Sequence, residues 1–269
     1  MPKRAARTAV VLAGIASLSF AGPRRAEASD GDSIYAVDPI IDGAVIGGSA
    51  LLVVSLYTFA AGAIDTRCPC DPQEVNSFDR FAVNYHNDAA AWASDVTAGV
   101  AFLAPVALDW LALGQVRPFV EDLTVYAEAI ALSAAAVTVA KQLAQRPFPR
   151  TYQGDPNLVN SPNGYRSFYS GHTGLVFAAL STASVTYGER YGFSWVPWAI
   201  TLAVGASIAI ERVAAGWHFP TDVITGALAG TAIGIAVPVV HLRRLRLLPF
   251  TSAGPDGPGA GLMLAGRWR

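Results

Sequence analysis

A histidine and an aspartate stand four residues apart near the end of the stretch "ERVAAGWHFPTD". Pro220 suits the first turn of a helix, so His218 and Asp222 are expected on one face where that helix begins. A carboxylate placed there can accept one ring N–H, fix the tautomer and leave the other ring nitrogen free to attack. A histidine that only caps a helix is the plainer alternative.

A second histidine lies in the stretch "SFYSGHTG", where an apolar run begins. Ser170 is a good N-cap residue, and Gly171 would let the backbone approach a ligand closely. The N–H groups that open a helix form an anion site, and His172 in the first turn would be suited to donate a proton to a leaving group. The plainer alternative is a turn followed by a helix start.

Basic residues supply the charge that an anion would need. The stretch "KQLAQRPFPR" begins at Lys141, contains Arg146 and ends at Arg150, and Arg212 follows a long apolar run. Arginine binds phosphate through two parallel hydrogen bonds and lysine acts as a point charge. Lys141 and Arg146 could instead extend to a membrane interface, whereas a charge beside an apolar run tends to be functional. Together the three stretches predict phosphate binding, attack by histidine and protonation of the departing oxygen.

The composition places this chemistry in a membrane. Of 269 residues, 52% are hydrophobic and only 14% are charged, whereas soluble domains carry about 25% charged residues. The net charge of −1 gives no indication of a nucleic-acid partner. A soluble protein with unusually hydrophobic helices is the alternative.

Six apolar segments predict an all-α fold, a six-helix transmembrane bundle. Their lengths are near the roughly 20 residues that cross a bilayer, with the fourth segment marginal. Alternation of direction would bring the three chemical stretches to one membrane face. The segments are Ala44–Ile64, Ala93–Leu113, Leu123–Ala140, Thr173–Tyr187, Trp195–Ile210 and Val223–Val240.

The two ends of the chain give conflicting evidence on orientation. Residues 1–28 resemble a signal peptide, with a basic start, a short apolar stretch and the small-x-small site "AEA"; an uncleaved anchor or a cytoplasmic tail is the alternative. The tail, residues 243–269, is expected to be flexible, basic and Gly/Pro-rich. Its arginines favour a cytoplasmic C-terminus, so the site would face outward, whereas a cleaved signal peptide would invert this arrangement.

The two cysteines, Cys68 and Cys70, are too few for a disulfide framework or a closed metal site. With a single proline between them they are poorly placed to bridge each other. We expect unpaired thiols in a loop.

The motifs resemble those of the type 2 phosphatidic acid phosphatase superfamily, which also includes bacterial acid phosphatases and vanadium haloperoxidases. The family pattern is a lysine, six residues, then Arg-Pro; Pro-Ser-Gly-His; and Ser-Arg, five residues, His, three residues, Asp. The third motif is matched by Arg212, His218 and Asp222, and the second by Ser170–His172. The likeness runs from about residue 141 to residue 240.

The sequence departs from the family pattern in three places. Tyr169 replaces the proline and Glu211 replaces the serine, and both changes are mild. The larger change is Phe148, which stands where the family has the arginine of its first motif. Arg146 or Arg150 must then supply the missing contact, and Arg146 is favoured because it precedes the prolines.

The resemblance implies a residue for each role. His218 would be the nucleophile that forms a phosphohistidine, Asp222 would orient it, and His172 would act as acid and then as base for water. The phosphate would be held by Lys141, Arg146, Ser170, Gly171 and Arg212, with Arg150 as a further candidate. No metal or cofactor is implied.

The resemblance also implies a domain and a setting. Residues 29–242 would form a transmembrane phosphatase domain with its motifs in residues 141–222. It would lie among the lipids of a bacterial inner membrane with its site facing the periplasm, and its substrate would be a lipid phosphate of undetermined identity. A vanadate-dependent haloperoxidase, a catalytically impaired relative and a non-enzymatic transporter are the alternatives, and the oligomeric state stays open.

Overall fold

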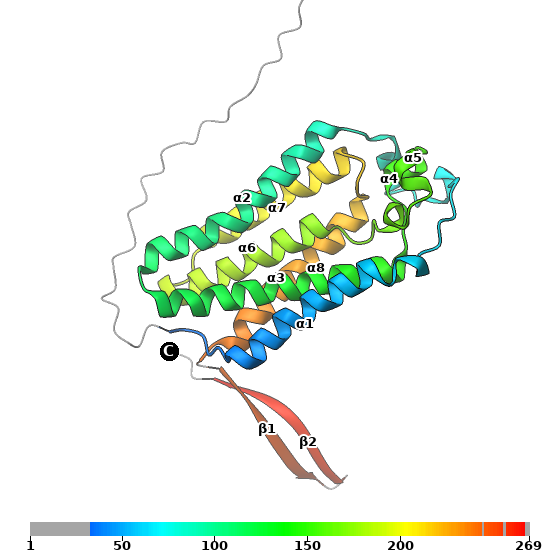
Figure 1. Ribbon diagram of the computed structural model, residues 1–269. Helices are drawn as coiled ribbons and strands as arrows, with labels where there is room; N and C mark the ends of the chain where they lie inside the picture. Colours follow the sequence, from blue (N-terminus) through cyan, green and yellow to red (C-terminus); the bar gives the residue numbers. More distant parts are fainter. Residues whose placement is uncertain (1–32, 244, 255–256, 267–269) are drawn as a thin grey trace, which may run out of the picture.

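The computed structural model describes residues 33–243, 245–254 and 257–266, and its main feature is a bundle of six long helices (Figure 1). These are α1 Pro39–Thr58, α2 Asp88–Leu113, α3 Val116–Ala144, α6 Gly171–Tyr191, α7 Trp195–Ala214 and α8 Pro220–His241. Short elements join them: η1 Ala61–Ala63, η2 Pro72–Glu74, η3 Arg80–Asn84, α4 Pro149–Tyr152, α5 Pro156–Val159 and η4 Pro162–Tyr165.

Each long helix coincides with one of the six apolar segments, so the helical bundle is confirmed. Among the described residues, five helices are long and apolar enough to cross a membrane, namely α1, α2, α3, α7 and α8. Helix α6 is 21 residues long but carries many hydroxyl side chains, and most of its residues are buried against the other helices. Because its neighbours shield it from lipid, it needs less hydrophobicity. Its crossing of the membrane stays a prediction.

Helices α6 and α8 approach each other closely along a stripe of glycines. A Cβ atom added at Gly230 would lie 2.1 Å from the carbonyl oxygen of Gly174, and one at Gly234 would lie 2.3 Å from that of Ala178. Small residues allow such contact between helix backbones. Since α6 begins beside His172 and α8 begins after His218, this contact determines how the two histidines are placed relative to each other.

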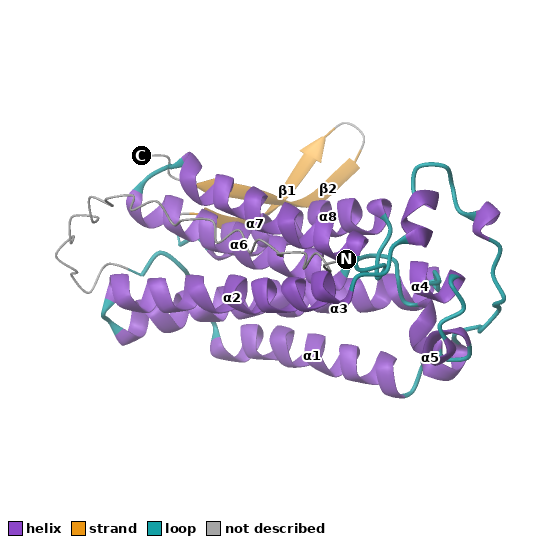
Figure 2. Cartoon of the chain, turned by 90° about the horizontal axis from the view of Figure 1, so that it is seen from above, coloured by secondary structure: helices purple, strands orange, loops and turns teal. Residues whose placement is uncertain are grey.

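The connections that carry the three chemical stretches gather at one end of the bundle, around α4 and α5 (Figures 1 and 2). The start of α1 and the end of α8 meet at the other end, where the Ala36 N–H donates to the His241 carbonyl at 2.8 Å. This arrangement confirms that the three stretches converge at one end of the bundle; that this end lies at a membrane face stays a prediction.

A two-stranded antiparallel hairpin follows α8, formed by β1, Leu245–Gly254, and β2, Gly257–Gly266. It occupies most of the region expected to be a flexible tail, so the all-α expectation holds for the bundle but not for this part of the chain. The glycine and proline content predicts a flexible coil, but backbone pairing between the two neighbouring halves of the tail forms a hairpin despite that preference. The predicted signal peptide, residues 1–28, lies outside the described residues.

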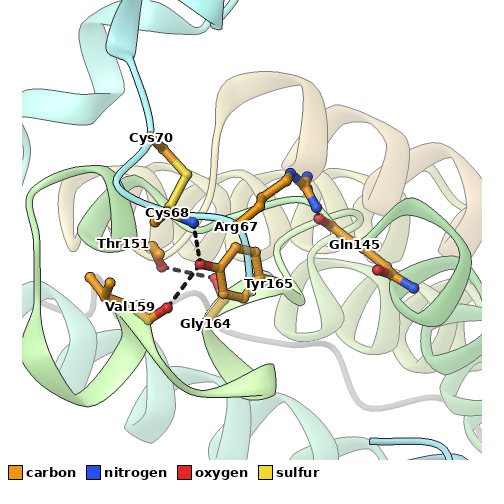
Figure 3. The surroundings of a disulfide bond; sticks show 8 residues. All are labelled: Arg67, Cys68, Cys70, Gln145, Thr151, Val159, Gly164 and Tyr165. Carbon is orange, nitrogen blue, oxygen red and sulfur yellow. Dashed lines mark hydrogen bonds between the residues drawn. A yellow bond between two sulfur atoms is a disulfide. The ribbon is translucent and has the colours of Figure 1, made fainter. Parts of the chain in front are cut away.

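Cys68 and Cys70 form a disulfide in the segment between α1 and α2, so the prediction of unpaired thiols is wrong (Figure 3). Their Cα atoms are 4.4 Å apart, at the short end of the range that a disulfide requires. The disulfide loop packs on the site end of the bundle. There the Cys68 N–H donates to the Tyr165 hydroxyl at 2.9 Å, and Arg67 donates to the Gln145 carbonyl at 2.8 Å.

The contact between α6 and α8 is tested by Gly230→Ala. The added methyl would overlap the α6 backbone and force the helices apart, at a cost of about 1–3 kcal/mol. We expect the midpoint of thermal unfolding in detergent to fall by several degrees. Gly188→Ala is the matched control, because a Cβ at Gly188 meets nothing within 4 Å, and its Tm should stay level or rise. Equal Tm values for the two variants would contradict the close contact.

Candidate functional site

His218 lies in the short turn between α7 and α8, and Asp222 lies in the first turn of α8. Gly216 makes that turn with a φ of 72°, and a Cβ there would be 2.1 Å from the Tyr85 carbonyl oxygen, so only glycine fits. His218 Nδ1 lies 3.7 Å from Asp222 Oδ2, beyond direct hydrogen-bond distance, and both residues are buried. The sequence-predicted pair is therefore brought together, with the carboxylate on the Nδ1 side of the ring.

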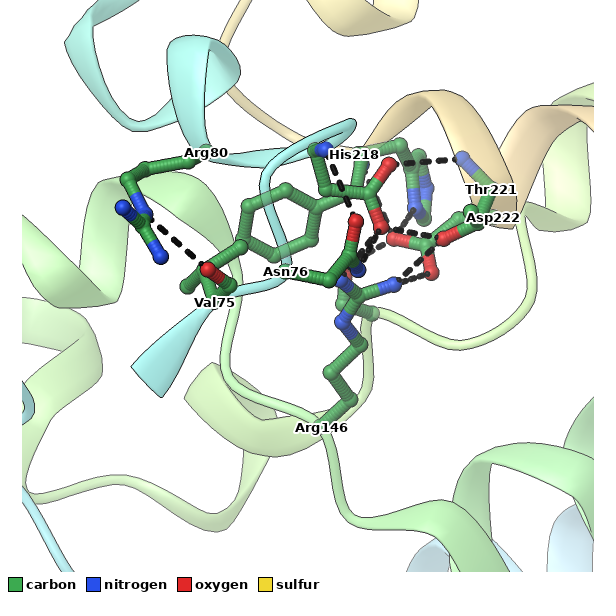
Figure 4. Close-up of polar contacts among 10 residues, drawn as sticks. Val75, Asn76, Arg80, Arg146, His218, Thr221 and Asp222 are labelled. Carbon is green, nitrogen blue, oxygen red and sulfur yellow. Dashed lines mark hydrogen bonds and ion pairs between the residues drawn. The ribbon is translucent and has the colours of Figure 1, made fainter. Parts of the chain in front are cut away.

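Asp222 is the centre of a polar network (Figure 4). Its Oδ2 accepts from the Ser167 hydroxyl at 2.5 Å and from the Phe219 N–H at 2.9 Å. Its Oδ1 accepts from Arg146 at 2.7 Å. These donors hold the carboxylate as an anion in one orientation beside the imidazole.

Arg146 contacts two carboxylates. Besides Asp222, its guanidinium pairs with Asp79 at 2.8 Å and donates to Thr221 at 2.8 Å, and it lies over the Phe219 ring. The sequence motifs predict that Arg146 contacts phosphate. The structure instead gives its donors to Asp79 and Asp222, which makes it a residue that positions Asp222.

Asp79 anchors this network from the segment before α2. It accepts from the Thr221 N–H at 3.0 Å, from the Thr221 hydroxyl at 2.5 Å and from Asn76 at 2.9 Å. Burial raises the pKa of Asp79, but the hydrogen bonds from Thr221, Arg146 and Asn76 outweigh burial and hold that pKa below its usual range. Asp79 is therefore a fixed negative charge under the guanidinium.

His172 stands at the start of α6, as predicted. The Ser170 side chain caps this helix by accepting from the Thr173 N–H at 3.4 Å, and the Ser170 N–H donates to the Asp222 carbonyl at 3.1 Å. His172 Nε2 lies 2.9 Å from Asp95 Oδ1. The backbone bond from Ser170 to Asp222 ties the two histidine-bearing helix starts together.

Lys141 and Arg212 are the predicted cations that face both imidazoles. Lys141 is buried near the end of α3, and its ammonium donates to the Arg166 carbonyl. Arg212 donates to Ser94 and to Asp95, each at 3.3 Å, while its Nε is buried with no acceptor among the described residues. Both cations interact electrostatically with His172 and with His218. The site therefore contains buried donors with unused hydrogen-bonding capacity.

Phe148 packs where the family pattern has an arginine. Its ring makes edge contacts with Trp217, at 5.4 Å between centroids, and with His218, at 5.5 Å. Arg150 does not replace the missing charge, because it donates to the Ala215 carbonyl and to Asp88 and lies over Trp217. The aromatic ring therefore holds the imidazole by packing.

Sequence reasoning missed three residues of the site: Asp79, Asp95 and Ser167. Asp95 could have been found, because it is a charge inside an apolar segment and such charges are commonly functional. Asp79 and Ser167 lie in polar connections where acidic and hydroxyl residues are ordinary. No local signal distinguishes them there.

Burial lowers the pKa of His218 to about 3; Asp222 opposes this shift, and Lys141 and Arg212 reinforce it. The imidazole is therefore neutral at pH 7 and keeps the lone pair that a nucleophile needs.

The buried neutral imidazole predicts a pH effect on stability. The unfolded chain protonates His218 below pH 6.5 while the folded chain does not, so His218 lowers the free energy of unfolding as the pH falls. Between pH 7 and 5 wild type should lose about 2 kcal/mol more than His218→Gln. Tm measured at both pH values checks this, with the exposed-histidine variant His86→Gln as control. A pH-independent difference between wild type and His218→Gln would contradict a neutral His218.

The comparisons with known proteins agree with the motifs. No curated protein and no solved structure matches the chain. Residues 122–246 match the model of the PAP2 superfamily. That range holds both histidines, Lys141, Arg212 and Asp222, whereas Asp79 and Asp95 precede it. The resemblance predicted from the sequence is therefore confirmed, because residues 122–246 match the superfamily of the type 2 phosphatidic acid phosphatases.

Proposed function

We propose that the chain is a membrane phosphatase that hydrolyses a phosphate monoester or diphosphate of a lipid through a phosphohistidine. The family match and the apolar helices support a membrane phosphatase. The observation that carries the finer proposal is the group of buried donors around a neutral imidazole. Arg212 Nε has no acceptor, and the Lys141 ammonium has one identified acceptor for its three protons. A phosphate group would satisfy such donors.

The proposed first step is attack on phosphorus. Asp222 lies on the Nδ1 side of His218, which leaves Nε2 as the attacking nitrogen. The new bond joins Nε2 to phosphorus while the bond from phosphorus to the leaving oxygen breaks. His172 donates a proton to that oxygen, and Lys141 and Arg212 stabilise the charge on the phosphoryl oxygens.

The proposed second step returns the enzyme to its starting state. His172, now neutral, accepts a proton from water, whose oxygen attacks phosphorus and displaces His218 Nε2. Asp95 lies 2.9 Å from His172 Nε2, so its carboxylate orients the imidazole ring. The reaction needs water alone as co-reactant, and we propose that it requires no metal.

A lipid substrate fits the position of the site. The site lies at one end of a bundle whose helices expose many large apolar side chains, such as Leu51 on α1 and Leu103 on α2. An acyl or isoprenoid tail could stay in lipid while the phosphate enters between the helix ends.

The Cys68–Cys70 disulfide supports the outward orientation of the site. It packs on the site end of the bundle, and disulfides persist on the oxidising side of a bacterial inner membrane. The C-terminal end, with Arg243, would then face the cytoplasm.

Phosphate release by purified protein tests the proposal. With phosphatidate or an isoprenyl diphosphate in detergent, His218→Ala should fall to background. His172→Ala should lose about 10²–10⁴-fold in kcat. His86→Ala removes an exposed imidazole outside the site and should match wild type. Equal release by wild type and His218→Ala would refute the assignment.

Two further outcomes separate the alternatives. Halogenation that requires vanadate and peroxide, without phosphatase activity, would favour the haloperoxidase. Inactivity of wild type on every lipid phosphate tried would favour the transporter or the impaired relative, in which Phe148 weakens phosphate binding.

Substitution of Arg146 and of Arg212 should affect different kinetic constants. Because its guanidinium contacts Asp79 and Asp222, Arg146→Gln should lower kcat about 10–100-fold with little change in KM. Arg212→Gln should raise KM, since that side chain keeps an unpaired donor for the phosphate. Steady-state kinetics of both variants decide between the two roles. A rise in KM for Arg146→Gln comparable to that for Arg212→Gln would restore Arg146 as a phosphate contact.

A further inference from the structure

A second cluster of titratable side chains lies at the end of the bundle opposite the candidate site. It joins Asp42 near the start of α1, Glu128 on α3 and His241 at the end of α8. One ligand atom from each residue lies within 4.8 Å of the others, and their side chains are only 7%, 8% and 10% exposed. Three ionisable groups from three helices are thus gathered where they are largely shielded from water.

The hydrogen bond of His241 determines which ring nitrogen faces the carboxylates. Its Nδ1 lies 2.8 Å from the Val237 carbonyl oxygen, which can only accept, so Nδ1 carries the proton. In the neutral ring Nε2 then presents a lone pair. That nitrogen lies 3.3 Å from Asp42 Oδ1 and 3.3 Å from Glu128 Oε2. In metal-binding histidines, the ring nitrogen that does not bind the metal commonly donates its N–H to a carbonyl oxygen, and this bond fixes the tautomer.

Glu128 provides an independent indication of a missing positive partner. Glu128 is 6% exposed. Its Oε2 lies 3.3 Å from His241 Nε2, but it accepts no hydrogen bond from any of the described residues. Burying a carboxylate oxygen without a partner is costly. Two carboxylates and one lone pair therefore surround a space that requires positive charge.

The spacing fits a small first-row cation. Ligand atoms about 2.0–2.1 Å from a tetrahedral zinc ion are separated by about 3.3 Å, which matches both measured distances from Nε2. An imidazole ligand suits zinc and disfavours magnesium or calcium, which prefer oxygen. Two carboxylates and a neutral imidazole also balance a charge of +2.

We propose that Asp42, Glu128 and His241 bind a divalent cation of the zinc type, which ties α1 to α3 and α8. The cation has a structural role and takes no part in the chemistry at His218. Three protein ligands leave a fourth position for water. The start of α1 is otherwise joined to the end of α8 through residues 35 and 36, so the ion would fasten the N-terminal end of the bundle.

Zinc binding by the purified full-length chain tests this proposal. After chelator treatment, Zn²⁺ at buffered nanomolar to micromolar free concentration should bind at one equivalent by metal analysis. Saturation should raise Tm by about 5–10 °C. Glu128→Gln and His241→Gln should lose the tight equivalent and the Tm rise, whereas His86→Gln should keep both.

Two controls keep the result interpretable. His218→Ala should retain the zinc equivalent, because that histidine lies at the other end of the bundle; loss there would place the ion in the candidate active site and refute the proposal. Absence of zinc binding and of a Tm rise in wild type would leave the cluster as an imidazolium between two carboxylates, and would also overturn it. This wild-type measurement does not depend on whether the variants fold.

Discussion

The close contact between α6 and α8 is the constraint on which the rest of the site depends. Glycines on α8 let the two backbones touch, and the Ser170 N–H then reaches the Asp222 carbonyl. His218 precedes α8 and His172 lies in the first turn of α6. The relative position of the two histidines therefore depends on contact between helix backbones more than on flexible side chains. A site fixed in this way loses little conformational entropy when it binds an anion.

Around that contact, charge is arranged in two layers. In the inner layer, Arg146 forms ion pairs with both Asp222 and Asp79. The outer layer is Lys141 and Arg212, which keep unused donors and interact electrostatically with both imidazoles. In the proposed mechanism the first layer would orient the nucleophile and the second would attract the phosphate. One arginine serves each layer, Arg146 in contact with two carboxylates and Arg212 with an unpaired Nε donor.

Much of this arrangement could be predicted from the sequence. Hydrophobic segments located all six long helices, and the alternation of their directions placed the three motifs at one end. Ser170 was recognised as an N-cap because serine accepts backbone N–H bonds at helix starts. These features follow from local rules of helix formation and from the length of the segments.

The remainder depends on long-range contacts that local rules do not contain. Arg146 was expected to face phosphate, but Asp79, 67 residues earlier, captures its guanidinium. The cluster of Asp42, Glu128 and His241 likewise joins residues distant in the chain. The hairpin β1–β2 is a local pairing, but the glycine- and proline-rich composition does not indicate it. The disulfide is also a local contact, since only one proline separates Cys68 from Cys70, and this close spacing predicts unpaired thiols.

Asp95 gives the resting site an anion of its own. Tethered to α2, its carboxylate touches both Arg212 and His172, the two groups to which the proposed reaction assigns phosphate binding and proton transfer. In the proposed cycle an incoming phosphate would compete with this carboxylate for the guanidinium, and Asp95 would restore its contact once phosphate leaves. Because Asp95 is part of the chain, this competing carboxylate would weaken the binding of substrate and of inorganic phosphate alike. The proposed enzyme would then bind its substrate less tightly but release its product faster.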